Sequence, residues 1–260
     1  MPSPRDVLAL IERIRCISSE EERQHLLSSL GAVERPTILS FVNAHSVNLC
    51  ATSAPALAAF RASDVILRDG IALQLSLPWL GQPAGLNMNG TDFIPLLLRT
   101  LSARRVAIYG TATPWLERCR THLEDCTPHA YVDLQHGFHP NGHYIECARQ
   151  HRPDVILLAM GMPRQEEVAV ELKRALDHKV LIVNGGAIVD FLAGRFARAP
   201  TLVQRLGFEW AFRLAQEPRR LFRRYCVGAF GFAHNVLLLR RAAATRSSRA
   251  PAPAPMHKEL

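Results

Sequence analysis

The chain has 260 residues, of which 48% are hydrophobic and 21% charged, and its formal net charge is +8. This composition excludes a largely disordered chain and allows one large core or two modest ones. The charge is uneven: residues 1–204 hold equal numbers of basic and acidic residues, whereas residues 205–250 hold ten arginines and two glutamates. The C-terminal quarter is therefore either a surface for something anionic or a solvated basic tail.

Short apolar runs alternate with longer helical patterns along the chain, as in a mostly parallel sheet covered by helices. Because the runs are apolar throughout, the strands should be buried on both faces. The predicted strands are residues 37–42, 65–67, 105–109, 154–159 and 180–183. The predicted helices are residues 44–62, 92–103, 113–125, 142–151 and 164–177, followed by a basic helical segment.

This pattern predicts a Rossmann-like α/β core over residues 1–200, with an α/β portion at 37–100 and a Rossmann-like portion at 105–200. A binding cleft is expected between the two portions. Residues 201–242 are expected to form a basic helical appendage that can associate with a membrane, and residues 243–260 a disordered tail. The sequence has no apolar run long enough to span a bilayer and its six cysteines have no paired spacing, so we expect a cytoplasmic protein with reduced thiols.

Polar residues follow the first two predicted strands, at the ends where such sheets bind ligands. Asn43 follows the first strand and could bind a sugar or a phosphate, or cap the next helix. Asp69 follows the second strand in an Asp-Gly turn and is a candidate general base, although the same position also suits a helix cap.

The later strands end in turns that suit a nucleotide. Paired or single glycines permit close approach of phosphate groups, and a polar side chain nearby could bind ribose hydroxyls. The residues concerned are Gly110, Gly161, Gln165, Gly185, Gly186 and Asp190. No GxGxxG or Walker motif is present, which disfavours an alternative interpretation as a Rossmann-type oxidoreductase.

Three histidines, His136, His139 and His143, suggest a metal site at first sight. However, they lie in a segment with Pro, Asn and Gly rather than at i, i+4 positions of a helix, and no Cys or carboxylate cluster accompanies them. We therefore expect no metal and no other cofactor.

Several of these residues belong to a longer ordered set of motifs. The set comprises Asn43, Asp69, Gly70 and residues 90–92, 161–166, 186–191, 193–194, 198–200, 207–210, 213–214, 217–221 and 224–225. In this order, over about residues 37–240, the chain resembles the WecG/TagA/CpsF glycosyltransferases, bacterial enzymes of surface polysaccharide and teichoic-acid assembly.

The resemblance implies an inverting, metal-independent transfer of a sugar from a UDP-sugar to a polyprenyl-diphosphate-linked sugar at the inner face of the cell membrane. It matches Asp69 to the catalytic base, Asn43 to a residue near the reacting centre, and Gln165 and Asp190 to the nucleotide-sugar pocket. It also matches the C-terminal segment to an appendage that completes the active site. The arginines inside the motifs are then expected to bind the acceptor diphosphate: Arg213, Arg219, Arg220 and Arg224.

Two positions depart from the family pattern. Phe41 stands where the family often has Thr, and Asn87 stands where it often has Arg. The donor and acceptor sugars are therefore not carried over from the family. A nucleic-acid-binding protein is a further alternative, but no nucleic-acid fold motif accompanies the basic segment. The sequence does not decide whether the protein forms a homo-oligomer.

Overall fold

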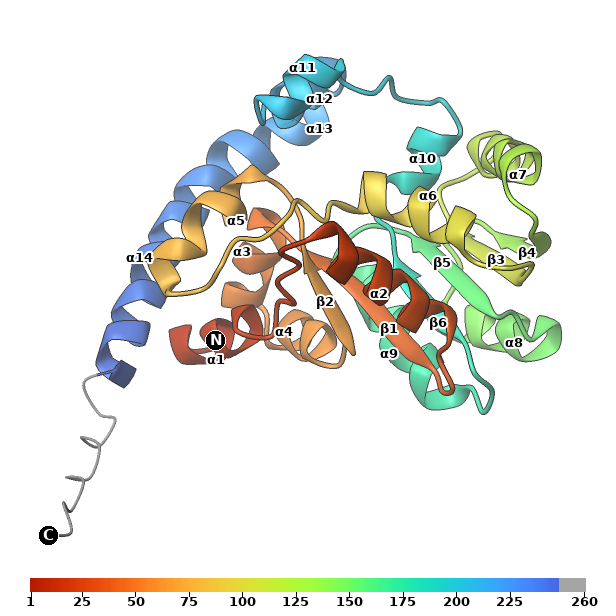
Figure 1. Cartoon of the computed structure of the whole chain (residues 1–260), viewed down its shortest axis with the longest axis horizontal. Coiled ribbons are helices and arrows are strands. Elements are labelled where there is room, and N and C mark those ends of the chain that lie inside the picture. Colours follow the sequence, from red (N-terminus) through yellow and green to blue (C-terminus); the bar gives the residue numbers. More distant parts are fainter. Residues whose placement is uncertain (248–260) are drawn as a thin grey trace, which may run out of the picture.

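The computed structural model describes residues 1–247, in which a parallel sheet forms the centre of the molecule (Figure 1). The strands are β1 (Thr37–Val42), β2 (Val65–Arg68), β3 (Arg105–Gly110), β4 (Ala130–Gln135), β5 (Val155–Ala159) and β6 (Leu181–Asn184). Every pairing is parallel, and the order across the sheet is β2-β1-β6-β5-β3-β4. The predicted Rossmann-like α/β class is confirmed.

The edge strand β4 has no counterpart among the strands predicted from the sequence. Its residues, AYVDLQ, mix polar and apolar types, and most of its side chains are partly exposed. Because an edge strand has a neighbour on one side only, here β3, it is less covered and needs no continuous apolar run. A search for apolar runs finds strands buried on both faces and misses this one.

Helices cover both faces of the sheet. One face packs against α2, α6, α7 and α10, and the other against α1, α3 and α4 at the β2 end and α8 and α9 further along. The core helices are α1 (Pro4–Ile11), α2 (Glu20–Gly31), α3 (Ala44–Thr52), α4 (Ala54–Arg61), α5 (Ile71–Ser76), α6 (Gly90–Thr100), α7 (Trp115–Cys126), α8 (Asn141–His151), α9 (Arg164–Ala175) and α10 (Ile188–Leu192), with a 3-10 turn, η1, at Pro78–Leu80.

The prediction of one helix over residues 44–62 is wrong, because the chain breaks at Ser53 into α3 and α4. Ser53 has an extended backbone conformation, and its side chain accepts a hydrogen bond from the Ala56 amide at 3.2 Å. Pro55 has no N–H and so cannot continue the hydrogen-bond pattern of α3. A serine cap followed by a proline in the first turn is a local signal that the helical periodicity concealed.

The C-terminal segment consists of short helices followed by a long one: α11 (Thr201–Arg205), α12 (Glu209–Gln216), α13 (Pro218–Phe222), a π-helical turn η2 (Arg223–Val227) and α14 (Gly228–Ser247). An extended segment leads from α10 to the group α11–α13, and α14 then runs back past α3, η1 and α1 (Figure 1). Residues 243–247 of the expected tail are thus helical, and the rest of that tail, residues 248–260, lies outside the described residues.

One side of α14 belongs to the hydrophobic core. Phe232, Val236 and Leu239 are buried in a cluster with side chains of α1, α3 and α4. The side chain of Phe230, on the same helix, is 81% exposed. Within residues 1–247, no helix combines the length and the apolar character needed to cross a membrane.

Replacing Phe232 with Ala should lower the free energy of unfolding by about 3–5 kcal/mol, because the change leaves a cavity in a buried cluster. The matched change Phe230→Ala removes an exposed ring from the same helix and should alter the free energy by less than about 0.5 kcal/mol. Urea unfolding followed by circular dichroism measures both. Equal losses would contradict the burial of this side of α14.

Candidate active site

The parallel strands bring the predicted site residues to one edge of the sheet. Asn43 follows β1, Asp69 follows β2, and Gly110 ends β3, while Gly161 and Gly185 lie just beyond β5 and β6. Since the strands all run in one direction, these residues lie in a row that follows the strand order. Asp69 and Asn43 are at one end of this row, and Gly110 is near the other.

Asn43 both caps a helix and contacts Asp69. Its Oδ1 accepts hydrogen bonds from the amides of His45 at 3.0 Å and Ser46 at 3.2 Å, which caps α3. Its Nδ2 donates to Oδ2 of Asp69 at 3.3 Å. Because the cap occupies the oxygen, the amide presents a donor to the carboxylate. The two roles weighed from the sequence are therefore compatible, and the cap sets the orientation of the amide.

The Asp69 carboxyl is held at the sheet edge. Its backbone N–H donates to the carbonyl oxygen of Val42 at 2.8 Å. Burial raises the pKa of this carboxyl, opposed by the hydrogen bond from Asn43 and by the charges of nearby arginines, among which Arg224 has the largest effect. A carboxylate with a raised pKa accepts a proton more readily than an exposed one, as a general base must.

Arg68, which the sequence interpretation did not single out, fixes the turns beside Asp69. Its buried guanidinium donates to the carbonyl oxygens of Ala84 at 2.9 Å, Gly70 at 3.1 Å and Gly85 at 3.3 Å. These contacts join the turn after β2 to the loop before α6. An arginine that closes an otherwise apolar strand was the available signal, because a buried cation requires several acceptors.

A cavity of about 590 Å³ lies beside Asp69, between the ends of β1 and β2 and the C-terminal helices. This volume is in the range of small-molecule sites. The polar and charged residues on its wall include Asn43, Asp69, Asn87, Glu209, Arg213 and Arg224. The cavity therefore unites both residues predicted to act at the reacting centre with part of the basic segment.

The four predicted arginines separate into two pairs. Arg213 and Arg224 line the cavity, and the buried Nε of Arg224 has no hydrogen-bond partner among the described residues. Arg219 and Arg220 are exposed on α13 and do not belong to the cavity wall. Arg220 lies 2.5 Å from the carboxylate of Glu217. Two arginines are thus available to a ligand in the cavity, and two lie on the molecular surface.

Two residues on the cavity wall that were not among the predicted site residues have a shifted pKa. Burial and the charge of Arg224 lower the pKa of His45 to about 4, so its imidazole is neutral at neutral pH. Burial raises the pKa of the Glu209 carboxyl. Glu209 lies in the motif at residues 207–210, but it follows no strand, and the search at strand ends therefore passed over it.

The residues predicted to hold the nucleotide-sugar lie over β6, β5 and β3, outside the wall of this cavity. Gln165 is buried; its Oε1 accepts from the Gly186 amide at 3.0 Å and its Nε2 donates to Glu166 at 2.8 Å. Asp190 accepts from the Thr111 hydroxyl at 2.6 Å. These contacts connect the turns that follow three neighbouring strands.

The four predicted glycines of this region are needed for two different structural reasons. A Cβ on Gly110 would lie 2.4 Å from the Ala159 carbonyl oxygen, and one on Gly185 would lie 2.5 Å from a side chain of α10. These two positions are explained by close packing. Gly161 and Gly186 have positive φ angles, +80° and +61°, and open space where a side chain would be. The open space at these two positions leaves room for a ligand to approach.

The rings of His136 and His139 stack with centres 3.8 Å apart, and the ring of His143 lies tilted against His139 with centres 4.0 Å apart. His143 also lies 3.0 Å from the Gln135 side-chain oxygen. Across residues 1–247, no group of three or more His, Cys, Asp or Glu side chains is arranged to hold a metal ion. The histidines contact one another rather than converging on a common point.

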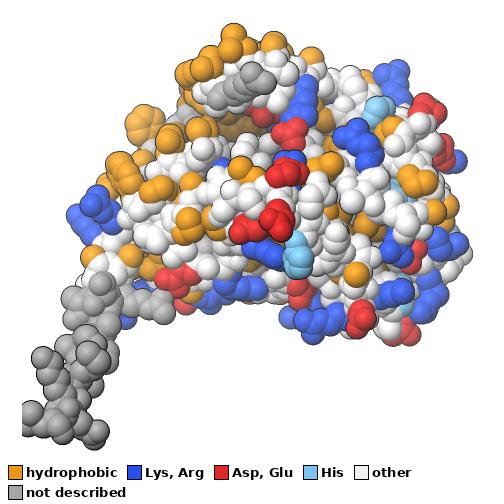
Figure 2. Space-filling view, in the orientation of Figure 1, with side chains coloured by type: hydrophobic (Ala, Val, Ile, Leu, Met, Phe, Trp, Pro, Cys, Tyr) orange, Lys and Arg blue, Asp and Glu red, His pale blue; other side chains and the backbone are white. Residues whose placement is uncertain are grey.

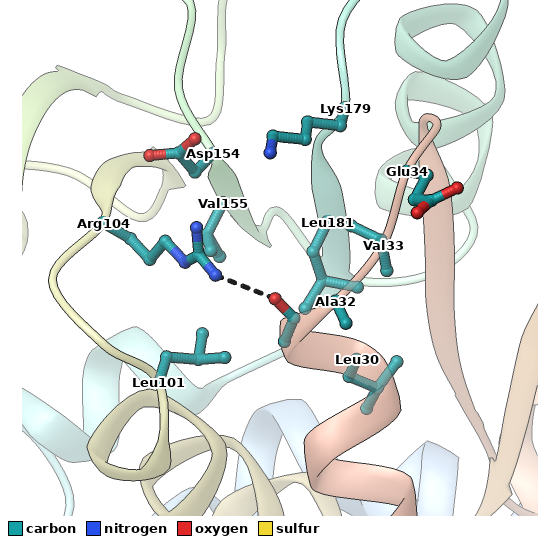
Figure 3. Close-up of a pocket in the computed structure, with 11 residues that line it drawn as sticks. Leu30, Ala32, Val33, Glu34, Leu101, Arg104, Asp154, Val155, Lys179 and Leu181 are labelled. Carbon is teal, nitrogen blue, oxygen red and sulfur yellow. Dashed lines mark hydrogen bonds between the residues drawn. The ribbon is translucent and has the colours of Figure 1, made fainter.

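A second cavity, of about 350 Å³, lies at the amino ends of β3, β5 and β6 (Figure 3). Arg104 points across it and donates to the Gly31 carbonyl oxygen at 2.8 Å. Asp154 accepts from the Arg105 amide at 2.9 Å. Arg104 thus attaches the end of α2 to the start of β3, and Asp154 joins the starts of β5 and β3. The cavity wall contains no residue of the ordered motifs. The carboxyl edge is therefore the candidate active site.

The sequence profile described as "Glycosyl transferase WecG/TagA/CpsF family" matches residues 8–247. The chain belongs to this family. It is accordingly a glycosyltransferase, which decides against the oxidoreductase and nucleic-acid-binding alternatives.

Two family members from Staphylococcus aureus, strains MW2 and NCTC 8325 / PS 47, are similar to the chain. Each is 24% identical over 226 residues, which covers 84% of this chain and 82% of the relative. Both are named N-acetylglucosaminyldiphosphoundecaprenol N-acetyl-beta-D-mannosaminyltransferase.

Glu166, the partner of Gln165, should make the stability of the protein depend on pH. Burial raises the pKa of this carboxyl to about 7 in the folded state, against about 4.3 in an unfolded chain. The folded state therefore holds the proton more tightly, and this contribution to stability is lost as the pH rises from about 4.3 to about 7.

The variant Glu166→Gln removes this titration, so the wild type should lose on the order of 3 kcal/mol more than the variant between about pH 4 and about pH 8. Urea unfolding of both proteins at these pH values measures the difference. The same pH dependence in both proteins would contradict the raised pKa.

Proposed function

We propose that this glycosyltransferase moves a hexose or N-acetylhexosamine from a UDP-sugar to a polyprenyl-diphosphate-linked N-acetylglucosamine in bacterial surface polysaccharide assembly. The main support is the cavity on whose wall Asp69, bound by Asn43, lies together with Arg213 and Arg224. The acceptor follows the name of the Staphylococcus aureus relatives. The donor is proposed only as a class, because Asn87 on the cavity wall stands where the family often has arginine.

Asp69 is the proposed general base of an inverting reaction. The acceptor hydroxyl attacks the anomeric carbon of the donor from the side opposite UDP, and its proton passes to the Asp69 carboxylate. The bond from the anomeric carbon to the UDP oxygen breaks as the new glycosidic bond forms. Asn43 binds Oδ2 of Asp69 and leaves Oδ1 for the proton. A positioned base contributes about 10²–10⁴-fold to such a rate.

Two sets of groups are proposed to bind the two diphosphates. The backbone of the turns at Gly161 and Gly186 meets the UDP phosphates, and Asp190 accepts from the ribose hydroxyls. Arg213 and Arg224 bind the acceptor diphosphate, because a guanidinium matches two phosphate oxygens at once. Fixed backbone donors next to the UDP phosphates stabilise the charge of the leaving UDP. Because these donors can take the place of a metal ion, we expect transfer without one.

The C-terminal helices are proposed to lie against the cytoplasmic face of the membrane that holds the acceptor. Apolar side chains gather over α11–α13 (Figure 2). On these helices and at the start of α14, six large apolar side chains are between 54% and 81% exposed: Leu202, Leu206, Phe208, Phe222, Val227 and Phe230. Arg219 and Arg220 are exposed on the same segment, and each contributes about 1 kcal/mol next to an anionic surface.

The variant Asp69→Asn should lower acceptor-dependent UDP release by about 10²–10⁴-fold, because an amide cannot take the proton. Its UDP-sugar affinity should be largely unchanged. UDP release is measured with a panel of UDP-sugars and polyprenyl-diphosphate-linked N-acetylglucosamine, in a buffer with EDTA to remove metal ions. Calorimetry measures the affinity for the UDP-sugar.

The control Asp177→Asn changes a carboxyl that is 84% exposed and should keep full activity. An active Asp69→Asn variant would overturn the assignment of the base. A wild type that releases no UDP in response to the acceptor, with any donor and with or without Mg²⁺, would overturn the proposed function.

The double variant Phe222→Ser/Phe230→Ser should bind vesicles that contain anionic phospholipid at least about tenfold more weakly, because two aromatic side chains no longer enter the interface. Phe138→Ser, which changes a phenylalanine that is 72% exposed in the loop after β4, serves as the matched control and should bind normally. Co-sedimentation measures binding. If the double variant pellets like the wild type, this surface does not contact the membrane.

A further inference from the structure

Glu209 is a half-buried carboxylate on the wall of the cavity that contains Asp69. It is the first residue of α12, and its side chain makes no hydrogen bond or close ion pair with any residue whose side chain the structure describes. Withdrawing a carboxylate from water without a partner costs free energy. Its oxygens are therefore available to the hydrogen-bond donors of a ligand in the cavity.

The cations near Glu209 have other partners. Arg198 pairs with Asp92, and Arg213 lies 3.8 Å from the carboxylate of Glu217. Both arginines lower the pKa of Glu209 at longer range, whereas burial and the neighbouring carboxylates raise it. Among the residues whose side chains the structure describes, none thus neutralises this carboxylate by direct contact.

A role in stabilising the helix does not explain this position. An acidic residue in the first turn interacts favourably with the partial positive charge of a helix N-terminus. An exposed carboxylate serves that purpose equally well, as Glu117 does in the first turn of α7. The helix alone therefore requires neither partial burial nor a place on the cavity wall.

The chemistry of the acceptor separates the two kinds of charge on this wall. The diphosphate is anionic, so Arg213 and Arg224 attract it and Glu209 repels it. The sugar is neutral and carries hydroxyl and amide N–H donors, which a carboxylate accepts strongly. Glu209 therefore suits the sugar of the acceptor and not its diphosphate.

We propose that Glu209 binds the acceptor sugar, accepting hydrogen bonds from its hydroxyl or amide groups, and thereby directs the attacking hydroxyl toward Asp69. This assignment rests on the proposed function. It makes Glu209 a determinant of acceptor specificity, while the general base remains Asp69.

Calorimetry with two ligands tests the assignment: a short-chain polyprenyl diphosphate that carries N-acetylglucosamine, and the same lipid diphosphate without the sugar. Glu209→Ala should weaken binding of the sugar-bearing lipid about 10–100-fold, as expected for a lost hydrogen bond to a charged group. It should leave binding of the plain lipid diphosphate within about twofold. Arg224→Gln should weaken binding of both ligands. Glu117→Ala, the control for a helix N-terminus, should change neither.

Glu209→Gln keeps the shape of the side chain and one acceptor oxygen, and should recover part of the affinity lost in Glu209→Ala; circular dichroism establishes that each variant is folded. If Glu209→Ala weakens both ligands equally, or neither, Glu209 does not bind the sugar. Binding requires no turnover, so this result is distinct from the transfer assay. A wild type that prefers the sugar-bearing lipid but transfers no sugar would contradict the proposed function and not this assignment.

Discussion

Strands β1 and β2 lie side by side in parallel register, with Val42 opposite Arg68, so Asn43 and Asp69 leave the sheet at the same level. The backbone N–H of Asp69 adds one more hydrogen bond to Val42 beyond the paired residues. The cap of α3 then turns the Asn43 amide so that it donates to the carboxylate. A shift of one residue in this register would send one of these side chains to the other face of the sheet and separate the pair.

The cavity beside this pair depends on contacts between α3 and the C-terminal helices. Asn48 of α3 donates to the Gly228 carbonyl oxygen at 2.8 Å and accepts from the Asn235 amide at 2.9 Å. These bonds, with the buried side of α14, attach the C-terminal helices to the N-terminal part of the core. Arg224 lies in η2, directly before α14, and its place on the cavity wall follows from this packing.

The positive charge of the C-terminal segment has two physical settings. Arg213 and Arg224 are partly buried on the cavity wall with Asp69, where fewer water molecules screen their charges. Arg219 and Arg220 are exposed, where water and salt weaken each charge and several must act together. The arginines of one run in the sequence thus lie in two settings, because those of α13 are exposed and do not belong to the cavity wall.

The sequence by itself determined the features that depend on neighbouring residues: strands that are apolar throughout, the polar residues and glycines that follow them, and the motifs of the family. It missed β4, which is only partly covered, and the break at Ser53. Tertiary structure alone decided that Asn43 binds Asp69, that Arg68 joins two turns, and that Glu209 shares a cavity with Asp69. The physical reason is that each of these relations joins residues far apart in the chain, and their distances depend on how the strands pair and how α14 packs against the core.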